Sequence, residues 1–160
     1  NENRKFHELS NKNISEYKKS LHLDNTLRGI YWITPHYKSS PKNEIIMLNK
    51  VKSKLNNKKN IMLISHYLFL DSITSTNLNS PSRTHTTDGA SVPMLNNKYF
   101  NYYKKFLYKK LEDNNIYEIY IIKVDEIETE IVTQFFSKDC YQKIEDDLFI
   151  IFKLSKRCFN

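Results

Sequence analysis

Residues 116–124 read IYEIYIIKV, and this stretch decides the fold class. Isoleucine, tyrosine and valine dominate it, and these residue types favour the β-strand. A second apolar run, Ile61–His66, reads IMLISH. Both runs are apolar at nearly every position rather than at alternate ones, which is typical of strands buried on both faces of a parallel sheet. We therefore expect both stretches in a sheet that helices cover on its two sides.

Two more strands are predicted around this pair. Gly29–Thr34 is rich in β-formers and stops at Pro35, and Leu148–Leu154 is the last apolar run of the chain. The second of these follows a short connection, so it is the strand that we expect to run antiparallel, at an edge of the sheet.

Three helices are predicted between the strands. The first begins at Ser40-Pro41, because serine is a good N-cap and proline suits the first helical position, and it stops at Asn56-Asn57. The second follows Asn97, and the third spans Ile127–Phe136 with acidic residues in its first turn. The alternation of strands and helices predicts an α/β, Rossmann-like three-layer domain with a mostly parallel sheet of about four strands.

The chain of 160 residues is long enough for one such domain, which we place at residues 28–160. Residues 1–27 are polar and lysine-rich, with scattered apolar positions, and are predicted to be a lead-in of one or two short amphipathic helices. No G-x-G-x-x-G turn is present, so the Rossmann-like architecture carries no dinucleotide signature. No apolar run reaches the roughly 18 residues that a membrane span needs.

The net charge of +7 comes from 21 lysines and only 4 arginines. Lysine codons are rich in A and T, and the abundance of asparagine, isoleucine and tyrosine points to the same bias in base composition. A specific nucleic-acid binder more often uses arginine, which reads bases with two hydrogen bonds. Nucleic acid is therefore not a predicted partner.

Polar side chains are expected to gather where the predicted parallel strands end, since ligands bind there in open α/β sheets. A loop without periodicity, Ser75–Asn96, starts at the same edge. An arginine there would hold a phosphate or carboxylate, and a histidine would donate or accept a proton. The predicted binding residues are His36, Ser65, His66, Arg83, His85 and Asp88.

Each of these residues also has a purely structural interpretation, because strand ends are polar and long loops bond their own backbone through Ser, Thr and Asp. No H-E-x-x-H or C-x-x-C spacing predicts a metal site, and no cofactor is predicted. The aromatic residues of the helix after Asn97 are expected to form a core face, with Tyr99, Tyr102 and Phe106 broadening a buried stripe.

Cys140 and Cys158 are the two cysteines of the chain, and they flank the last predicted strand. In a reducing cytoplasm both would be free thiols, whereas an oxidising compartment would permit a disulfide. A bond between them requires the chain to double back through Tyr141–Asp147, with Asp146-Asp147 as the turn. The sequence leaves both states open.

Three stretches give the chain a resemblance to a known group of proteins. They are Arg28–Pro35 (RGIYWITP), Asn79–Thr84 with Asp88-Gly89, and Asn97–Lys104 (NKYFNYYK). In amino-acid sequence and in their order along the chain, they resemble the C-terminal soluble region of a group of bacterial multi-pass membrane proteins. These proteins are glycosyltransferase-like and related to dolichyl-phosphate-mannose mannosyltransferases.

The resemblance implies a periplasmic accessory domain whose catalytic loop lies in the membrane part of its parent chain. Such a domain would contact an acceptor or a polyprenyl-phosphate sugar donor and would be inactive alone. Its implied partners are the membrane part of its parent, a lipid-linked sugar or polysaccharide, and the membrane surface, where lysines meet anionic headgroups. Residues 1–27 then become a juxtamembrane segment.

Two other functions compete with this one. The chain could be a free-standing α/β enzyme or a binding protein for an anionic ligand at the carboxyl ends of the strands, although no G-x-S-x-G elbow supports a hydrolase. It could also be a basic module for a nucleic acid or membrane surface, which a steep salt dependence of binding would reveal.

Overall fold

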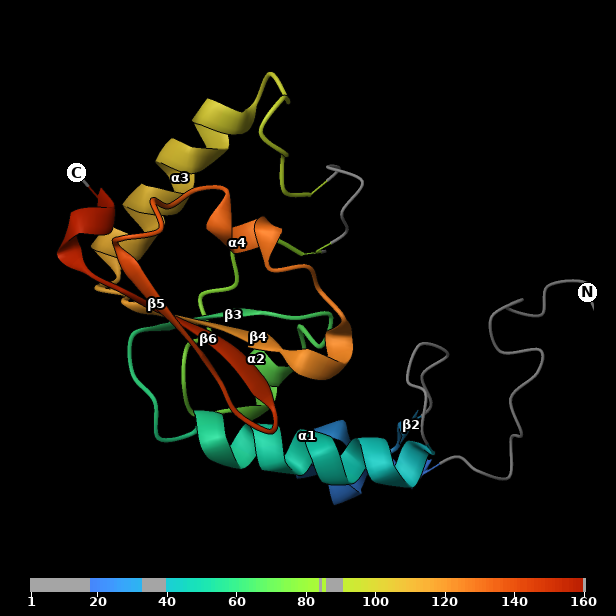
Figure 1. Ribbon diagram of the computed structural model, residues 1–160. Helices are drawn as coiled ribbons and strands as arrows, with labels where there is room; N and C mark the ends of the chain where they lie inside the picture. The colour runs from blue at the N-terminus through green and yellow to red at the C-terminus, as the bar shows by residue number, and fades with distance from the viewer. Residues whose placement is uncertain (1–17, 33–39, 84, 86–90, 160) are drawn as a thin grey trace, which may run out of the picture. The chain divides into compact units, whose positions relative to one another are not determined.

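The computed structural model describes residues 18–32, 40–83, 85 and 91–159 (Figure 1). The chain packs as two units, Asn1–Leu55 and Asn56–Asn160, each of which is described by itself. The predicted boundary at residue 27 stays a prediction, and most of that lead-in, residues 1–17, lies outside the described residues.

Unit 1 is built around helix α1, Pro41–Leu55, which begins and ends as predicted. The Ser40 hydroxyl accepts a hydrogen bond from the N–H of Asn43 (3.3 Å), so serine caps the helix and proline opens it. A salt bridge joins Lys52 of α1 to Asp24, and the bond to the Lys52 ammonium lowers the pKa of Asp24 to about 2.

The rest of described unit 1 is short. Strand β1, Lys18–Lys19, pairs antiparallel with β2, Tyr31–Trp32. Two 3-10 turns separate them, η3 (Ser20–His22) and η4 (Asn25–Leu27). The lead-in helices predicted before residue 28 therefore do not occur over residues 18–27, where short strands and 3-10 turns stand instead.

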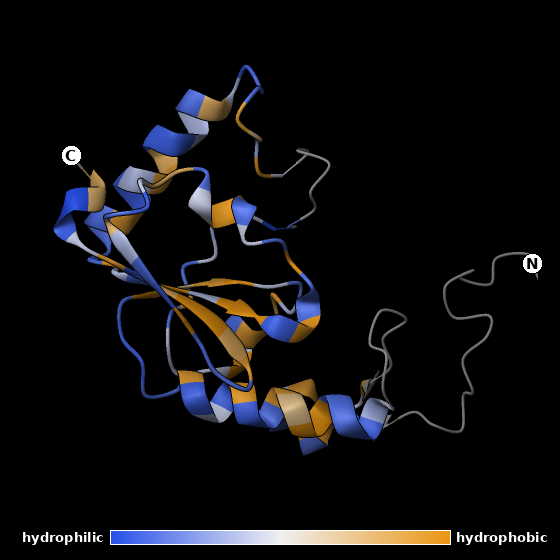
Figure 2. Ribbon diagram, viewed as in Figure 1, coloured by the Kyte–Doolittle hydropathy of each residue, from blue (hydrophilic) through white to orange (hydrophobic). Residues whose placement is uncertain are grey.

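Unit 2 contains a mixed four-stranded sheet in the order β3-β4-β6-β5. Strands β3 and β4 run parallel, whereas β4 with β6 and β6 with β5 run antiparallel. Figure 2 shows β3, β4 and β6 as largely hydrophobic, in keeping with their apolar sequences. The strand bounds are Ile61–Ile64 (β3), Glu118–Ile122 (β4), Tyr141–Glu145 (β5) and Phe149–Leu154 (β6).

One face of this sheet packs against helix α3, Phe100–Asp113, and the short helix α4, Glu130–Thr133. Alternate strand residues such as Met62, Ile119 and Phe152 join residues of both helices in one buried cluster. The positions between them point to the opposite face and are buried too, which explains the unbroken apolar runs of β3 and β4. A further short helix, α2 (Leu70–Ile73), lies on that opposite side (Figure 1).

The expectation of a mostly parallel sheet is wrong, and the mixed sheet does not confirm a Rossmann-like fold. The reason is the connection before β6, which is only three residues long. A parallel partner needs a crossover of a dozen residues or more, whereas a tight turn gives an antiparallel hairpin. The last strand is antiparallel as expected, but it lies inside the sheet rather than at its edge.

Two strand assignments also need correction. Within the described part of the predicted strand Gly29–Thr34, residues Tyr31–Trp32 form β2, which pairs with β1 and not with the main sheet. Ile33 and Thr34 lie outside the described residues. Ile30 beside β2 is 54% exposed, as expected for a strand outside a core. Strand β5 was not predicted, because its sequence Tyr-Gln-Lys-Ile-Glu is mainly polar, as suits an exposed edge strand.

The β5–β6 hairpin supplies the return of the chain that a Cys140–Cys158 bond requires. The Asp146 carboxylate accepts hydrogen bonds from the N–H groups of Leu148 (2.8 Å) and Phe149 (2.7 Å), which fixes the turn. In the structure the two cysteines form a disulfide with a Cα–Cα distance of 5.0 Å. Both cysteines are buried in the core cluster beneath α3 and α4.

Helix α3 is present as predicted, but its aromatic residues are divided between two faces. Phe100, Leu107 and Leu111 are buried. Tyr99, Tyr102 and Phe106 are 58%, 75% and 49% exposed, so the expectation that they broaden the buried stripe is wrong. The helix expected at Ile127–Phe136 is reduced to the four residues of α4, with turns on either side.

Candidate functional site

The carboxyl ends of the parallel strands β3 and β4 bring four polar residues together, which we call the strand-end cluster: Ser65, His66, His85 and Asp125. Ser65 follows β3 directly, and Asp125 ends the 3-10 turn η5, Lys123–Asp125, that follows β4. Parallel pairing places both positions at one edge of the sheet.

Asp125 is the centre of this cluster. The Ser65 hydroxyl donates to its Oδ2 (2.5 Å), and the backbone N–H of His66 donates to the same oxygen (3.1 Å). Ser65 Oγ also accepts from the N–H of Tyr67 (3.0 Å). Burial raises the pKa of Asp125, against the opposing effect of these hydrogen bonds.

His85 lies beside His66, with 6.3 Å between the two ring centroids. It is only 2% exposed, and neither of its ring nitrogens has a hydrogen-bond partner among the described residues. Burial, with a smaller contribution from the charge of His66, lowers the pKa of His85 to about 4. His85 is therefore neutral at pH 7.

The cluster is better suited to structure than to nucleophilic catalysis. A catalytic serine needs a histidine nitrogen within hydrogen-bond reach to take its proton. Here the Ser65 hydroxyl is bonded to a carboxylate and to a backbone N–H, and no described histidine nitrogen bonds to it. Ser65 and Asp125 therefore join the ends of β3 and β4.

Arg83 belongs to a different place in unit 2. It is exposed and lines a groove of about 540 Å³, together with residues of the 77–82 segment, α2 and the end of α3. A second hollow of about 510 Å³ lies next to it and shares Asn77, Asn79 and Asn114. We call the two hollows together the amide groove.

The segment along this groove is fixed to β3. The Leu63 N–H donates to the carbonyl of Leu78 (2.7 Å), and the Asn79 amide donates to the carbonyl of Ile61 (3.0 Å). Asn79 has a φ of 47° and Asn60, also in the groove, a φ of 54°. Asparagine tolerates this left-handed conformation better than most residues, so part of the asparagine content has a backbone reason.

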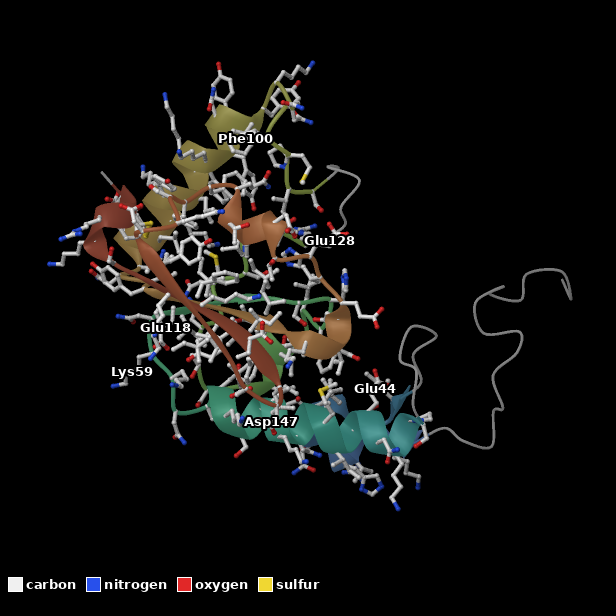
Figure 3. All side chains as sticks on the ribbon, viewed as in Figure 1. Glu44, Lys59, Phe100, Glu118, Glu128 and Asp147 are labelled. Carbon is white, nitrogen blue, oxygen red and sulfur yellow. A yellow bond between two sulfur atoms is a disulfide. The ribbon has the colours of Figure 1, made fainter. Side chains whose placement is uncertain are left out.

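The amide groove is basic and rich in groups that both donate and accept hydrogen bonds. Among the described residues, its basic lining side chains are Lys58, Lys59, Arg83 and Lys110, against the single acid Asp71. Lys59 extends outward from the loop before β3 (Figure 3). Such a surface fits a ligand that carries hydroxyls and a phosphate or carboxylate.

The structure thus divides the six predicted binding residues. Ser65, His66 and His85 come together, Arg83 lines the amide groove, and His36 and Asp88 lie outside the described residues. Two contributions were missed. Asp125 directly follows a predicted strand, so its place in the sheet could have revealed it. Nothing in the sequence signals that Lys110 of distant α3, and Asn114 just after that helix, line the Arg83 groove.

Comparisons with known proteins add no relative: no family model, curated protein or solved structure matches the chain. Within the described ranges, no three His, Cys, Asp or Glu side chains gather as a metal-binding set. None of the helices in the described part of the chain has the length and apolar character needed to cross a membrane.

Proposed function

We propose that this chain is a non-catalytic accessory domain of a membrane-bound, polyprenyl-phosphate-sugar-dependent glycosyltransferase, on the periplasmic side. The observation that carries this proposal is the basic amide groove, which suits a phosphorylated or acidic sugar. The resemblance of Arg28–Pro35, Asn79–Thr84 and Asn97–Lys104 to such proteins supplies the reaction class.

The disulfide supports the proposed compartment. Cys140 and Cys158 are 2% and 3% exposed and bonded to one another within the core. Structural disulfides of this kind form and persist in oxidising compartments such as the periplasm and are rare in the cytoplasm.

The proposed ligand is the acceptor or the lipid-linked sugar donor. Asparagine amides can bond to neighbouring sugar hydroxyls, since each amide both donates and accepts. Arg83 and Lys110 would bind the phosphate or carboxylate, with the planar guanidinium of Arg83 making two parallel bonds. Within the groove the domain would hold the ligand while the chemistry proceeds in the membrane part.

A binding experiment tests the groove directly. Amide chemical shifts of the ¹⁵N-labelled chain are recorded during titration with a hexose 1-phosphate, and again with the free hexose and with inorganic phosphate. We expect shifts at Asn77, Ser80, Ser82, Arg83 and Asn114, largest for the hexose phosphate. Arg83→Gln is expected to weaken binding about tenfold, as the loss of a charged hydrogen bond does.

Arg157→Gln is the matched control, because Arg157 is exposed in the 3-10 turn η6, Lys156–Phe159, and its loss changes net charge equally. Equal weakening by both variants would reduce the binding to non-specific charge attraction. Shifts confined to residues beside the strand-end cluster would instead support the alternative.

That alternative is a free-standing enzyme or binding protein whose site is the strand-end cluster. The buried His85, whose ring nitrogens have no partner among the described residues, favours it, since a neutral imidazole nitrogen can bond to a ligand. His85→Gln would then abolish the shifts caused by an anionic ligand, whereas the proposed groove requires that this variant bind as the unaltered chain does.

A further inference from the structure

Helix α3 and the turn before it carry an exposed row of apolar side chains. Leu95 is 66% exposed, and Tyr99, Tyr102 and Phe106 are 58%, 75% and 49% exposed. Tyr99, Tyr102 and Phe106 are three and four residues apart, the spacing of a single helical face, and Leu95 lies in the turn before the helix. We call these four residues the aromatic stripe.

Lysines accompany the stripe. At about 100° per residue, exposed Lys105 and Lys109 lie within roughly 60° of Tyr102 around the helix axis. The Lys98 ammonium lies 4.9 Å from the centre of the Tyr99 ring. The acids of α3, Glu112 and Asp113, are confined to its last turn, so the first two turns are basic and aromatic.

This part of α3 also protrudes. Figure 1 shows the start of the helix and its preceding turn extending beyond the sheet of unit 2. Phe100 marks that end in Figure 3, where side chains project outward around it. The stripe is therefore accessible to a flat surface, and a partner does not need a groove to reach it.

We propose that the aromatic stripe binds the surface of an anionic lipid membrane. Tyrosine and phenylalanine rings insert at the boundary between headgroups and acyl chains, and neighbouring lysines meet lipid phosphates while their aliphatic stems cover apolar surface. The alternation of rings and lysines matches such a surface in both polarity and charge. A second copy of the chain would bring the same lysines against one another, which charge repulsion opposes.

Membrane binding by the stripe goes beyond the proposed function. It rests on that function in one respect, namely that the domain lies next to a membrane. An accessory domain joined to the membrane part of its parent would gain orientation from a second contact with the lipid, which would present its groove consistently. Lipid binding by the stripe needs neither a sugar ligand nor a parent enzyme.

Vesicle co-sedimentation tests this inference with the chain as it is. Vesicles of phosphatidylcholine alone are compared with vesicles that contain one quarter phosphatidylglycerol. Each is measured at low salt and at 0.5 M salt, where the Debye length is only ~4 Å and charge attraction is strongly screened. We expect binding to the anionic vesicles that weakens steeply with salt, and little binding to the neutral ones.

Two pairs of variants locate the contact. Tyr99→Ser, Tyr102→Ser and Phe106→Ser combined are expected to lower partitioning at least about tenfold, since the buried apolar area is lost. Lys105→Gln with Lys109→Gln is also expected to lower partitioning at least about tenfold, because each lysine near an anionic surface contributes to binding. Each variant has a matched control at exposed positions outside the stripe, and both controls are expected to bind normally. The control for the aromatic variant combines Ile30→Ser, Ile46→Ser and Val124→Ser. The control for the lysine variant combines Lys42→Gln and Lys50→Gln.

Several results would overturn the inference. Normal partitioning of the aromatic variant, or an equal loss in the Lys42 and Lys50 control, would exclude the stripe as the contact. Sedimentation equilibrium that shows a dimer abolished by the aromatic variant would assign the face to a second copy. The hexose 1-phosphate titration is run on the same variants, so failure of lipid binding is distinguishable from failure of the proposed function.

Discussion

The two faces of helix α3 carry similar residues in opposite surroundings. Phe100 is 7% exposed and stacks on Phe135, with 4.9 Å between the ring centroids. Tyr102, half a turn away, is 75% exposed. A helix lying on a sheet buries a stripe of limited width, so the sheet decides which of many aromatic residues become core and which remain at the surface.

The two histidines of the strand-end cluster repeat this comparison with polar side chains. His85 is buried without a partner for its ring nitrogens among the described residues, whereas the neighbouring His66 is exposed. In both pairs the residue type is shared or nearly so, and burial alone separates a structural group from an accessible one. Substitutions on the two sides should therefore differ in size and in kind.

The largest effect is expected on the buried face of α3. Leu111 is fully buried in the core cluster, and Leu111→Ala is expected to lower the free energy of unfolding by about 2–5 kcal/mol, through lost burial and the cavity left behind. Urea denaturation measures the change. Leu95→Ala, at an exposed position, is the control and is expected to shift stability by less than about 0.5 kcal/mol; similar losses in both variants would contradict the comparison.

The next largest effect on stability is expected from reduction of the disulfide. Cys158 belongs to the same buried cluster as Leu111, and the bond to Cys140 closes a loop with a separation of 18 residues. A loop of this size gives about 3 kcal/mol of stabilisation in the chain-entropy treatment. Urea midpoints with and without reductant should differ accordingly, whereas a Cys140→Ala, Cys158→Ala variant should not respond to reductant.

The sequence predicted the elements of the fold better than their arrangement. Strands β3, β4 and β6 and helices α1 and α3 follow from local signals, namely apolar runs, the Ser40-Pro41 cap and helical spacing. The direction of β6 depends on the turn at Asp146-Asp147 and on a polar edge strand, β5, whose pattern resembles a loop. Which aromatic residues of α3 face outward could not be predicted. Their spacing gives the position of each residue around the helix axis, but not how wide a stripe of the helix the sheet covers.

The candidate site was predictable in the same partial way. Ser65 and Asp125 follow from the rule that parallel strands end at one edge, since each directly follows a strand. Arg83 instead joins Lys110 and Asn114, which are close in space only because the 77–83 segment lies near the end of α3. That contact depends on the packing of distant elements, which no local pattern reports.

A smaller effect, and one of different character, is expected for His85. Its pKa is lowered from 6.5 to about 4 in the folded chain, so the unfolded chain binds more protons between these values. Stability contributed by neutral His85 is complete above pH 6.5 and is lost as the pH falls towards 4, by roughly 2 kcal/mol between pH 7.5 and 5. Burial raises the pKa of Asp125, so its contribution has the opposite sign: stability is lost as the pH rises above the ordinary pKa of an aspartate.

The two contributions are separated by comparing variants. His85→Leu should remove the loss of stability below pH 6.5, and His66→Leu, on the exposed partner, should retain it. Urea denaturation of the three proteins at pH 7.5, 6 and 5 measures the difference. The same pH profile in the unaltered chain and in His85→Leu would show that His85 is not the buried, neutral group described here.

The smallest effect on stability is expected for Tyr102, and it separates the two faces of α3 most sharply. The ring is 75% exposed and is absent from the core cluster, so Tyr102→Ser should change the free energy of unfolding by no more than about 0.5 kcal/mol. The same substitution removes the most exposed ring of the aromatic stripe and should lower binding to anionic vesicles several-fold. Phe100→Leu is the matching change on the buried face: it should cost about 1 kcal/mol or more, because it loses ring stacking as well as volume, and should leave vesicle binding intact. If Tyr102→Ser instead destabilised the chain as much as Phe100→Leu, the ring would have to be packed in solution, and the division of α3 into a core face and a surface face would be wrong.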